Sequence, residues 1–142
     1  MSKELRFNDL TVGQQLEPFI NPPISRVQLA QYAGASGDFN PLHLDDEFAQ
    51  KIGMDGVIAH GMLIMGFLGQ YVMKIAGKQA MLTNFRMRFG AMTVPGDQIH
   101  CSAQVDKVYE ENGNKIAILE LTAEEEEGKT VGTGIAELRF YE

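Results

Sequence analysis

One segment constrains the fold of this chain more than any other: residues 62–76 contain only two polar side chains, Gln70 and Lys74. Gly77 follows directly, and glycine is a typical residue at the end of a helix. A helix of this length spans about 22 Å, whereas the apolar core of a bilayer is about 30 Å thick. The segment is therefore expected to be a buried helix around which the rest of the chain packs, and not a membrane span.

Two glycines lie inside this predicted helix, at Gly66 and Gly69. Each weakens a helix by up to about 1 kcal/mol relative to alanine. A small residue is useful where another backbone comes close, so we expect a neighbouring segment to approach the helix at these two positions.

After residue 80 the hydrophobic period changes from 3.6 to 2, which indicates β-strands. Apolar and polar residues alternate in 84–89 and in 99–105, and the Asn-Gly pair at 112–113 suits a hairpin turn before 115–123. On the last strand, 130–140, Gly132 and Gly134 share one face and are expected to leave room for the helix. Four strands in antiparallel meanders around one helix make an α+β domain.

Two short helices are expected before the long one. Ser25 and Gln28 are spaced as in a capping box, and the helix that they begin is expected to end at Gly34. Three carboxylates at 45–47 favour the start of a second helix of one or two turns that stops at Gly53. Residues 36–41, between the two helices, are rich in turn formers and predict a shaped loop.

The composition limits the class of protein. A chain of 142 residues with 44% hydrophobic and 22% charged residues suits one globular domain, 1–142, and excludes disordered, collagen-like and coiled-coil proteins. The net charge of -7 repels nucleic acid and anionic lipid, so we expect neither as a partner. The lone Cys101 cannot form an intramolecular disulfide and the first six residues lead into no apolar signal run, which predicts a cytoplasmic protein.

Common cofactor and metal motifs are missing from the sequence. It has no phosphate loop, no GxGxxG, no CxxC, no HExxH and no GxSxG. Three histidines, His43, His60 and His100, are not spaced four apart on any predicted helix. We therefore expect neither a cofactor nor a metal ion.

The most informative segment is 37–43, in which Asp38 and His43 lie five residues apart on a loop that Pro41 keeps from being helical. A carboxylate and an imidazole that face one water can divide the removal and the donation of a proton, which is what adding water to a double bond requires. The alternative is structural, because Asp38 is also suited to an Asx-turn and His43 to capping the next helix.

A second feature, Ala59-His60-Gly61, lies directly before the long helix. The first N–H groups of a helix lack internal acceptors and favour negative charge, and Gly61 allows a ligand to come close to them. A thioester carbonyl placed there would be stabilised as it gains enolate character. The alternatives are that Gly61 serves only packing and that His60 caps the helix.

Arg86 and Arg88 share the polar face of the strand 84–89. Two guanidinium groups at this spacing suit a phosphate or the acidic surface of a carrier protein. The strict alternation with apolar residues favours a solvated strand face instead.

The segments 32–43 (YAGASGDFNPLH) and 59–62 (AHGM) resemble the signature of the MaoC-like, (R)-specific enoyl-CoA hydratase family, and 94–97 (VPGD) extends the likeness into the strands. The resemblance is strongest to single-domain bacterial members, including (3R)-hydroxyacyl-ACP dehydratases. It implies a hot-dog fold, in which a curved antiparallel sheet wraps the long helix. It also implies a homodimer or larger assembly whose sheets join edge to edge, or a heterodimer in which one subunit lacks the catalytic pair.

The resemblance further implies reversible hydration of trans-2-enoyl thioesters to (3R)-hydroxyacyl thioesters in fatty acid metabolism, with acyl-CoA or acyl-ACP as substrate and no cofactor. By this resemblance the family's catalytic residues fall on Asp38 and His43, and Asn40 orients their loop. The oxyanion donor falls on the N–H of Gly61, and His60 is expected to take part in substrate binding. A serine that polymer-forming members carry in the helix is Gly69 here, so acyl-chain length does not transfer. The alternative of a hot-dog thioesterase is disfavoured because such enzymes place a carboxylate on the central helix, and residues 62–76 contain none.

Overall fold

The computed structural model describes residues 5–142. Residues 1–4 lie outside the described residues, and the prediction that the chain begins without a signal sequence depends partly on them. The helices are α1 (Arg26–Ser36), α2 (Asp46–Lys51) and α3 (Gly61–Ala76), with short 3-10 turns η1 (Phe7–Asp9) and η2 (Pro41–His43). The strands are β1 (Phe19–Ile20), β2 (Ala80–Phe89), β3 (Ile99–Glu111), β4 (Asn114–Glu125) and β5 (Thr130–Phe140).

The strands form one antiparallel sheet in the order β1-β3-β4-β5-β2. The prediction of four strands in simple meanders is wrong at both edges. A fifth strand, the two-residue β1, pairs with β3, and β2 pairs with the last strand of the chain, as at Phe85↔Ala136. The chain passes from α3 into β2, and β2 then pairs with β5, so that Phe85 lies opposite a residue 51 positions later in the sequence.

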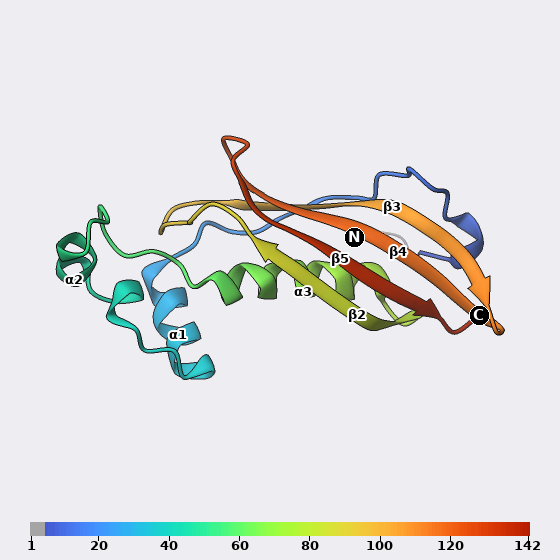
Figure 1. Ribbon diagram of the computed structural model, residues 1–142, viewed down its shortest axis with the longest axis horizontal. Helices are drawn as coiled ribbons and strands as arrows, with labels where there is room; N and C mark the ends of the chain where they lie inside the picture. The colour runs from blue at the N-terminus through green and yellow to red at the C-terminus, as the bar shows by residue number, and fades with distance from the viewer. Residues whose placement is uncertain (1–4) are drawn as a thin grey trace.

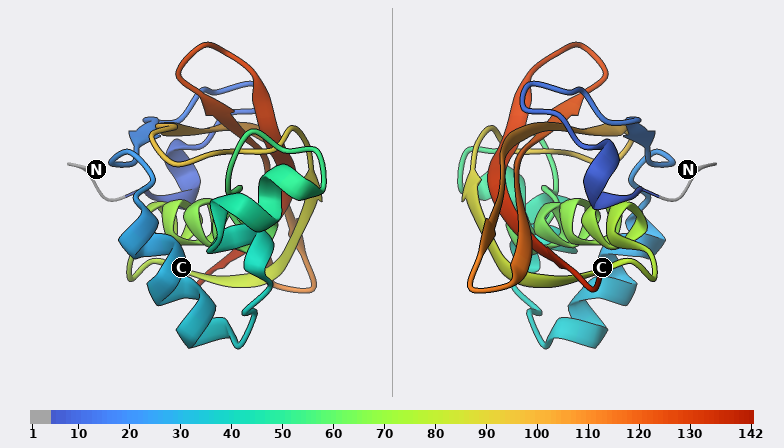
Figure 2. Two further views of the ribbon diagram at one scale, coloured as in Figure 1. Left: turned by 90° about the vertical axis from the view of Figure 1, so that its left-hand side faces the viewer. Right: turned by 90° about the vertical axis from the view of Figure 1, so that its right-hand side faces the viewer.

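The sheet curls around α3, which lies along its concave face, and α1 and α2 gather at the N-terminal end of α3 (Figures 1 and 2). Three α3 residues, Leu68, Tyr71 and Val72, are completely buried. The predicted buried helix and the predicted hot-dog architecture are therefore confirmed. Within residues 5–142, no helix has the length and apolar character needed to cross a bilayer.

One face of α3 is not covered. Met62 and Met73 are each more than half exposed, and a Cβ built on Gly66 would meet nothing within 4 Å. At Gly69 the nearest neighbour is the side chain of Phe85, at 3.4 Å from the Cβ position. The expectation that a backbone approaches α3 at these glycines is thus wrong for the single chain, because this side of the helix lies beyond the edge of the sheet.

The glycines of β5 serve the sheet and not the helix. The nearest atoms to a Cβ on Gly132 belong to Met87, and a Cβ on Gly134 would lie 2.6 Å from the backbone oxygen of Arg86. Both neighbours are on β2. The prediction that these glycines make room for α3 is therefore wrong, since they allow the paired strand β2 to lie close to β5.

The predicted helix caps are mostly confirmed. The Ser25 hydroxyl accepts a hydrogen bond from the Gln28 N–H at 3.0 Å, which begins α1. The helix does not end at Gly34 as predicted but continues to Ser36, where Gly37 takes a left-handed conformation with φ of 76°. Glycine within a helix costs only about 1 kcal/mol, so the end falls at the glycine whose backbone the turn requires.

The predicted hairpin turn is also confirmed, because Asn112 and Gly113 both have positive φ, 53° and 81°. The short helix α2 begins after Asp45, whose carboxylate accepts from two backbone N–H groups, and Gly53 follows its end with φ of 99°.

Candidate active site

Residues 37–43 form a rigid loop held by its own side chains. Asp38 Oδ1 accepts a hydrogen bond from the Asn40 N–H at 3.3 Å, and Asn40 Oδ1 accepts from the Leu42 N–H at 3.0 Å. The predicted Asx-turn at Asp38 is therefore present, but it uses only one carboxylate oxygen. The other oxygen, Oδ2, remains available, and the Asp38 side chain is 52% exposed.

His43 faces this free oxygen. Its Nδ1 lies 2.7 Å from the backbone oxygen of Ile58, and because a carbonyl only accepts, Nδ1 carries the proton of the neutral ring. The lone pair is then on Nε2, which lies 3.9 Å from Asp38 Oδ2. The alternative role of His43 as a helix cap is wrong, since Asp45 caps α2.

Hydrogen bonds from three successive backbone N–H groups fix the segment before α3 to three parts of the chain, one of them this loop. The Ile58 N–H donates to the Leu42 oxygen at 3.2 Å, and the Ala59 N–H donates to the Thr93 oxygen at 2.8 Å. The Val57 N–H donates to Asp46 Oδ1 at 3.0 Å. This bond, followed by the neighbouring Arg26 guanidinium, lowers the pKa of the Asp46 carboxyl. Asp46 thus fixes the approach to α3 from α2.

His60 is the residue before α3 and is buried, with 2% exposure. Its side chain makes no cap hydrogen bond, so the alternative that it caps the helix is wrong. Its Nε2 instead lies 3.2 Å from the backbone oxygen of Asp38. The ring stacks on His43, with centroids 3.8 Å apart, and meets the edge of Tyr32 at 4.8 Å.

Gly61 is the first residue of α3 and is exposed. The first N–H groups of a helix have no acceptor within it, and across residues 5–142 no hydrogen bond is found from the Gly61 N–H to a loop or side chain. A Cβ at this position would lie 3.2 Å from the ring of Phe89, an exposed residue at the end of β2. The site therefore offers a free backbone donor beside the loop of Asp38 and His43.

The structure brings the predicted site residues together. Asp38 contacts Asn40 and His60 by hydrogen bonds and faces His43, and His60 stacks on His43 and directly precedes Gly61. Tyr32 and Asp46 also support the site. Neither residue was predicted to belong to the site, although Tyr32 begins the segment 32–43 that resembles a family signature. Only its ring contact with His60 shows the role.

The side chains of Asp38, His43 and His60 each offer a ligand atom, and these atoms lie within 4.8 Å of one another. Spacing along the sequence did not indicate this cluster, because Asp38 and His43 lie in one loop and His60 lies 17 residues after His43. Carbonyl oxygens already occupy one nitrogen of each imidazole. That the site works without a metal ion stays a prediction.

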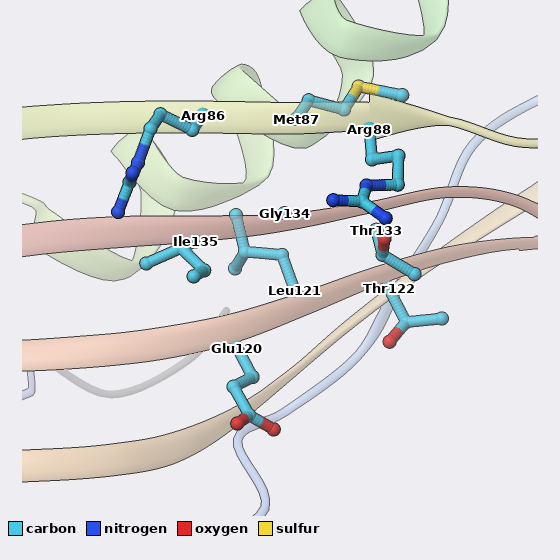
Figure 3. A pocket seen from close by; sticks show the side chains of 9 residues that line it. All are labelled: Arg86, Met87, Arg88, Glu120, Leu121, Thr122, Thr133, Gly134 and Ile135. Carbon is cyan, nitrogen blue, oxygen red and sulfur yellow. The ribbon is translucent and has the colours of Figure 1, made fainter.

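Arg86 and Arg88 lie outside this site. They alternate with Phe85 and Met87, which pack against the core, and so face away from α3. A shallow hollow of about 510 Å³ runs over this outer face, and its lining includes both arginines and Thr133 but none of the predicted site residues (Figure 3). Among residues 5–142 neither arginine forms an ion pair, which agrees with the predicted solvated strand face.

Cys101 is fully buried in β3. Burial raises the pKa of its thiol to about 11, so the reactive thiolate is scarce near neutral pH. Cys101 is therefore placed as a core residue of the sheet.

A family model described as MaoC like domain matches residues 7–128. The chain therefore belongs to the MaoC-like family, as the signature segments predicted.

Relatives of known activity agree with this assignment. The chain is 31% identical over 106 residues to an (R)-specific enoyl-CoA hydratase of Aeromonas caviae, which is 72% of this chain and 75% of that protein. It is 30% identical over 115 residues to a 3-hydroxybutyryl-CoA dehydratase of Methylorubrum extorquens, 78% and 72% of the two chains. The solved structure of an (R)-hydratase from A. caviae involved in PHA biosynthesis is similar with a TM-score of 0.83 at 27% identity, over 93% of this chain and 98% of that one. The predicted hydro-lyase class is confirmed by this agreement.

Proposed function

We propose that this protein catalyses the reversible syn addition of water to a trans-2-enoyl thioester, giving a (3R)-hydroxyacyl thioester. The observation that carries the proposal is the pair of free acceptors, Asp38 Oδ2 and His43 Nε2, 3.9 Å apart. This separation is too long for a direct hydrogen bond, but one water molecule can donate to both atoms. The names of the similar proteins, a hydratase and a dehydratase, support the reaction in its two directions.

The same geometry supports the following steps. As the water oxygen forms a bond to the β carbon, Asp38 and His43 take up its proton, and the π electrons move to the thioester oxygen as an enolate. The Gly61 N–H stabilises this oxygen. The retained proton then passes to the α carbon from the same side, so that H and OH add syn and no atom is left over. Because Asp38 and His43 face each other across 3.9 Å, one water held between them would meet the substrate from one side, which supports syn addition.

The substrate is a thioester of CoA or of an acyl carrier protein. The carrier group arrives with the substrate, so the reaction needs no separate organic cofactor. The remaining acceptors of the loop, Asp38 Oδ1 and Asn40 Oδ1, are used by backbone N–H groups, and we assign Asn40 the role of orienting the loop.

We further propose that the chain forms a homodimer through the edge of β2 and the uncovered face of α3. A ten-residue edge strand leaves a row of backbone groups without partners, and exposed edges of this kind pair readily. Met62, Gly66 and Met73 lie along the adjacent helix face and are exposed. An apolar face that continues an unpaired edge is suited to a second copy of the same surface.

The function is tested by following the loss of enoyl-thioester absorbance with crotonyl-CoA, a medium-chain enoyl-CoA and the matching ACP thioesters. Each reaction is run with and without a chelator, beside the Asp38→Asn variant, and the chirality of the product is assayed. We expect (3R) product with the wild type, no effect of the chelator and loss of activity in the variant.

Free thiol release without hydration would identify a thioesterase instead. Absence of turnover on every thioester by a folded wild type would overturn the proposal for the isolated chain, and restoration by a second MaoC-like chain would identify a heterodimeric dehydratase.

A further inference from the structure

His60 is the one predicted site residue for which the proposed chemistry has no use. With 2% exposure its ring offers almost no surface to a bound substrate. It also leaves the helix end uncapped, although it occupies the cap position of α3. A buried imidazole beside two catalytic groups therefore needs another explanation.

The contacts of His60 join the parts of the site that come from different elements. Through Nε2 it binds the backbone oxygen of Asp38 at 3.2 Å. Through its ring face it stacks on His43, with an interplanar angle of 25°. Its own backbone leads directly into Gly61. One residue thus contacts both members of the catalytic pair and precedes the backbone donor in the chain.

The protonation of His60 suits this role. Because the Asp38 oxygen only accepts, Nε2 carries the proton of the neutral ring, and Nδ1 is buried with no partner in residues 5–142. Burial is the largest effect on its pKa and lowers it; the Asp38 backbone bond and the Asp38 charge act in the opposite direction, and the charge of His43 adds to the lowering. Tyr32 contributes only the edge of its ring. A neutral ring adds no positive charge beside His43 when that residue holds a proton.

We propose that His60 is the positioning residue of this site: its ring and Nε2 fix the His43 ring and the Asp38 backbone relative to the first turn of α3. This inference rests on the proposed hydratase function. It differs from substrate binding, which would place His60 against the thioester.

The test compares His60→Leu, which removes both the stacked ring and the donor, with His60→Phe, which keeps a ring and removes the donor. His100→Leu is the matched control, because His100 is a partly buried histidine on β3 that is not part of the site. For His60→Leu we expect kcat for enoyl-thioester hydration to fall about 10²-fold with KM unchanged, as for a misplaced catalytic group. His60→Phe is expected to fall between His60→Leu and the wild type, and His100→Leu to match the wild type.

A second readout does not depend on turnover. The chain has only three histidines, so the imidazole nitrogens of His43 can be followed by NMR in each variant. The wild type is expected to show His43 as the single tautomer protonated on Nδ1. In His60→Leu the ring is no longer held, and its nitrogen shifts are expected to move toward the average of both tautomers.

Three outcomes would overturn the inference. They are wild-type kcat in His60→Leu, a raised KM with unchanged kcat, which indicates substrate binding, and an unchanged His43 tautomer in both variants. If His60→Leu does not fold, His60→Phe decides by the same criteria. If the wild type hydrates no thioester, the proposed function fails, while the His43 tautomer still tests the position of His60.

Discussion

The two oxygens of the Asp38 carboxylate have different tasks. Oδ1 accepts the Asn40 N–H and shapes the loop, whereas Oδ2 faces His43 Nε2. One side chain thus combines an observed structural role with the proposed chemical one, and a suitable substitution separates the two.

Asp38→Asn keeps an oxygen for the Asn40 N–H and removes the negative charge to which we assign the holding and activation of the water. We expect kcat to fall by about 10²–10⁴-fold, the usual contribution of one general acid or base. The measurement is hydration kinetics together with thermal unfolding, with an unchanged unfolding temperature as the control. Normal kcat in a folded variant would show that Asp38 serves only to form the turn and has no catalytic role.

At the scale of elements, the first turn of α3 combines an exposed N–H at Gly61 with the backbone conformation of His60, φ -63° and ψ 134°. That conformation is compatible with a following proline, and proline is well tolerated at the first position of a helix. The donor can therefore be removed without breaking the helix.

Gly61→Pro deletes the N–H that we assign to the enolate oxygen, and we expect kcat to fall by about 10²–10³-fold. Gly61→Ala is the matched control, because it places a Cβ against Phe89 in the same way but keeps the N–H. Steady-state kinetics distinguish the two. Equal losses in both variants would assign the effect to the contact with Phe89 and not to the donor.

The β2-β5 pairing makes a separate prediction about stability. A Cβ on Gly134 would lie 2.6 Å from the backbone oxygen of Arg86, and a backbone atom on a paired strand cannot move aside cheaply. We expect Gly134→Ala to lower the free energy of unfolding by about 1–3 kcal/mol, as overpacking does. Urea unfolding measures this, with the exposed neighbour Thr133→Ala as control. Equal stability of both variants would mean that β2 can shift away from β5 at this position without a measurable cost in the free energy of unfolding.

At the scale of the whole molecule, the uncovered face of α3 predicts self-association. Light scattering after gel filtration is expected to give twice the 15.7 kDa mass of the chain. Met73→Glu places a charge on the proposed interface and is expected to shift the protein toward the monomer. Val12→Glu is the control, since Val12 is also more than half exposed but lies before β1. A wild-type monomer would contradict the proposed homodimer.

The pH dependence of stability follows from His60. Its pKa is lowered from the ordinary 6.5, chiefly by burial. The unfolded chain therefore binds the proton more readily than the folded protein, and the free energy of unfolding decreases as the pH falls through 6.5 toward the folded-state pKa. The pKa of Asp46 is also lowered, from its ordinary 3.8, so its contribution to the free energy of unfolding is lost only as the pH falls below that value.

Urea unfolding at pH 7.5 and 5.5 tests this, and we expect the wild type to lose more stability on acidification than His60→Phe does. The same loss in both proteins would show that another group causes the pH dependence.

Local patterns were sufficient to predict much of this protein. The apolar run at 62–76, the alternation after residue 80 and the Asn112-Gly113 turn depend on neighbours in the sequence. The helix, the four long strands and the hairpin turn lie close to where they were expected. The signature segments around Asp38 and Gly61 also predicted the family. Each is a short continuous run of residues, and the loop of Asp38 is held by hydrogen bonds between residues that are close in sequence.

Only the tertiary structure decided which distant segments meet. The pairing of β2 with β5 placed Gly132 and Gly134 against β2, and left one face of α3 uncovered, because the concave sheet can cover only part of the surface of a helix. The stacking of His60 on His43 joins residues 17 positions apart through a buried contact that no periodicity records. The sequence by itself thus determined the elements and the chemical groups, while packing determined their partners, because contact energies depend on distance in space and not along the chain.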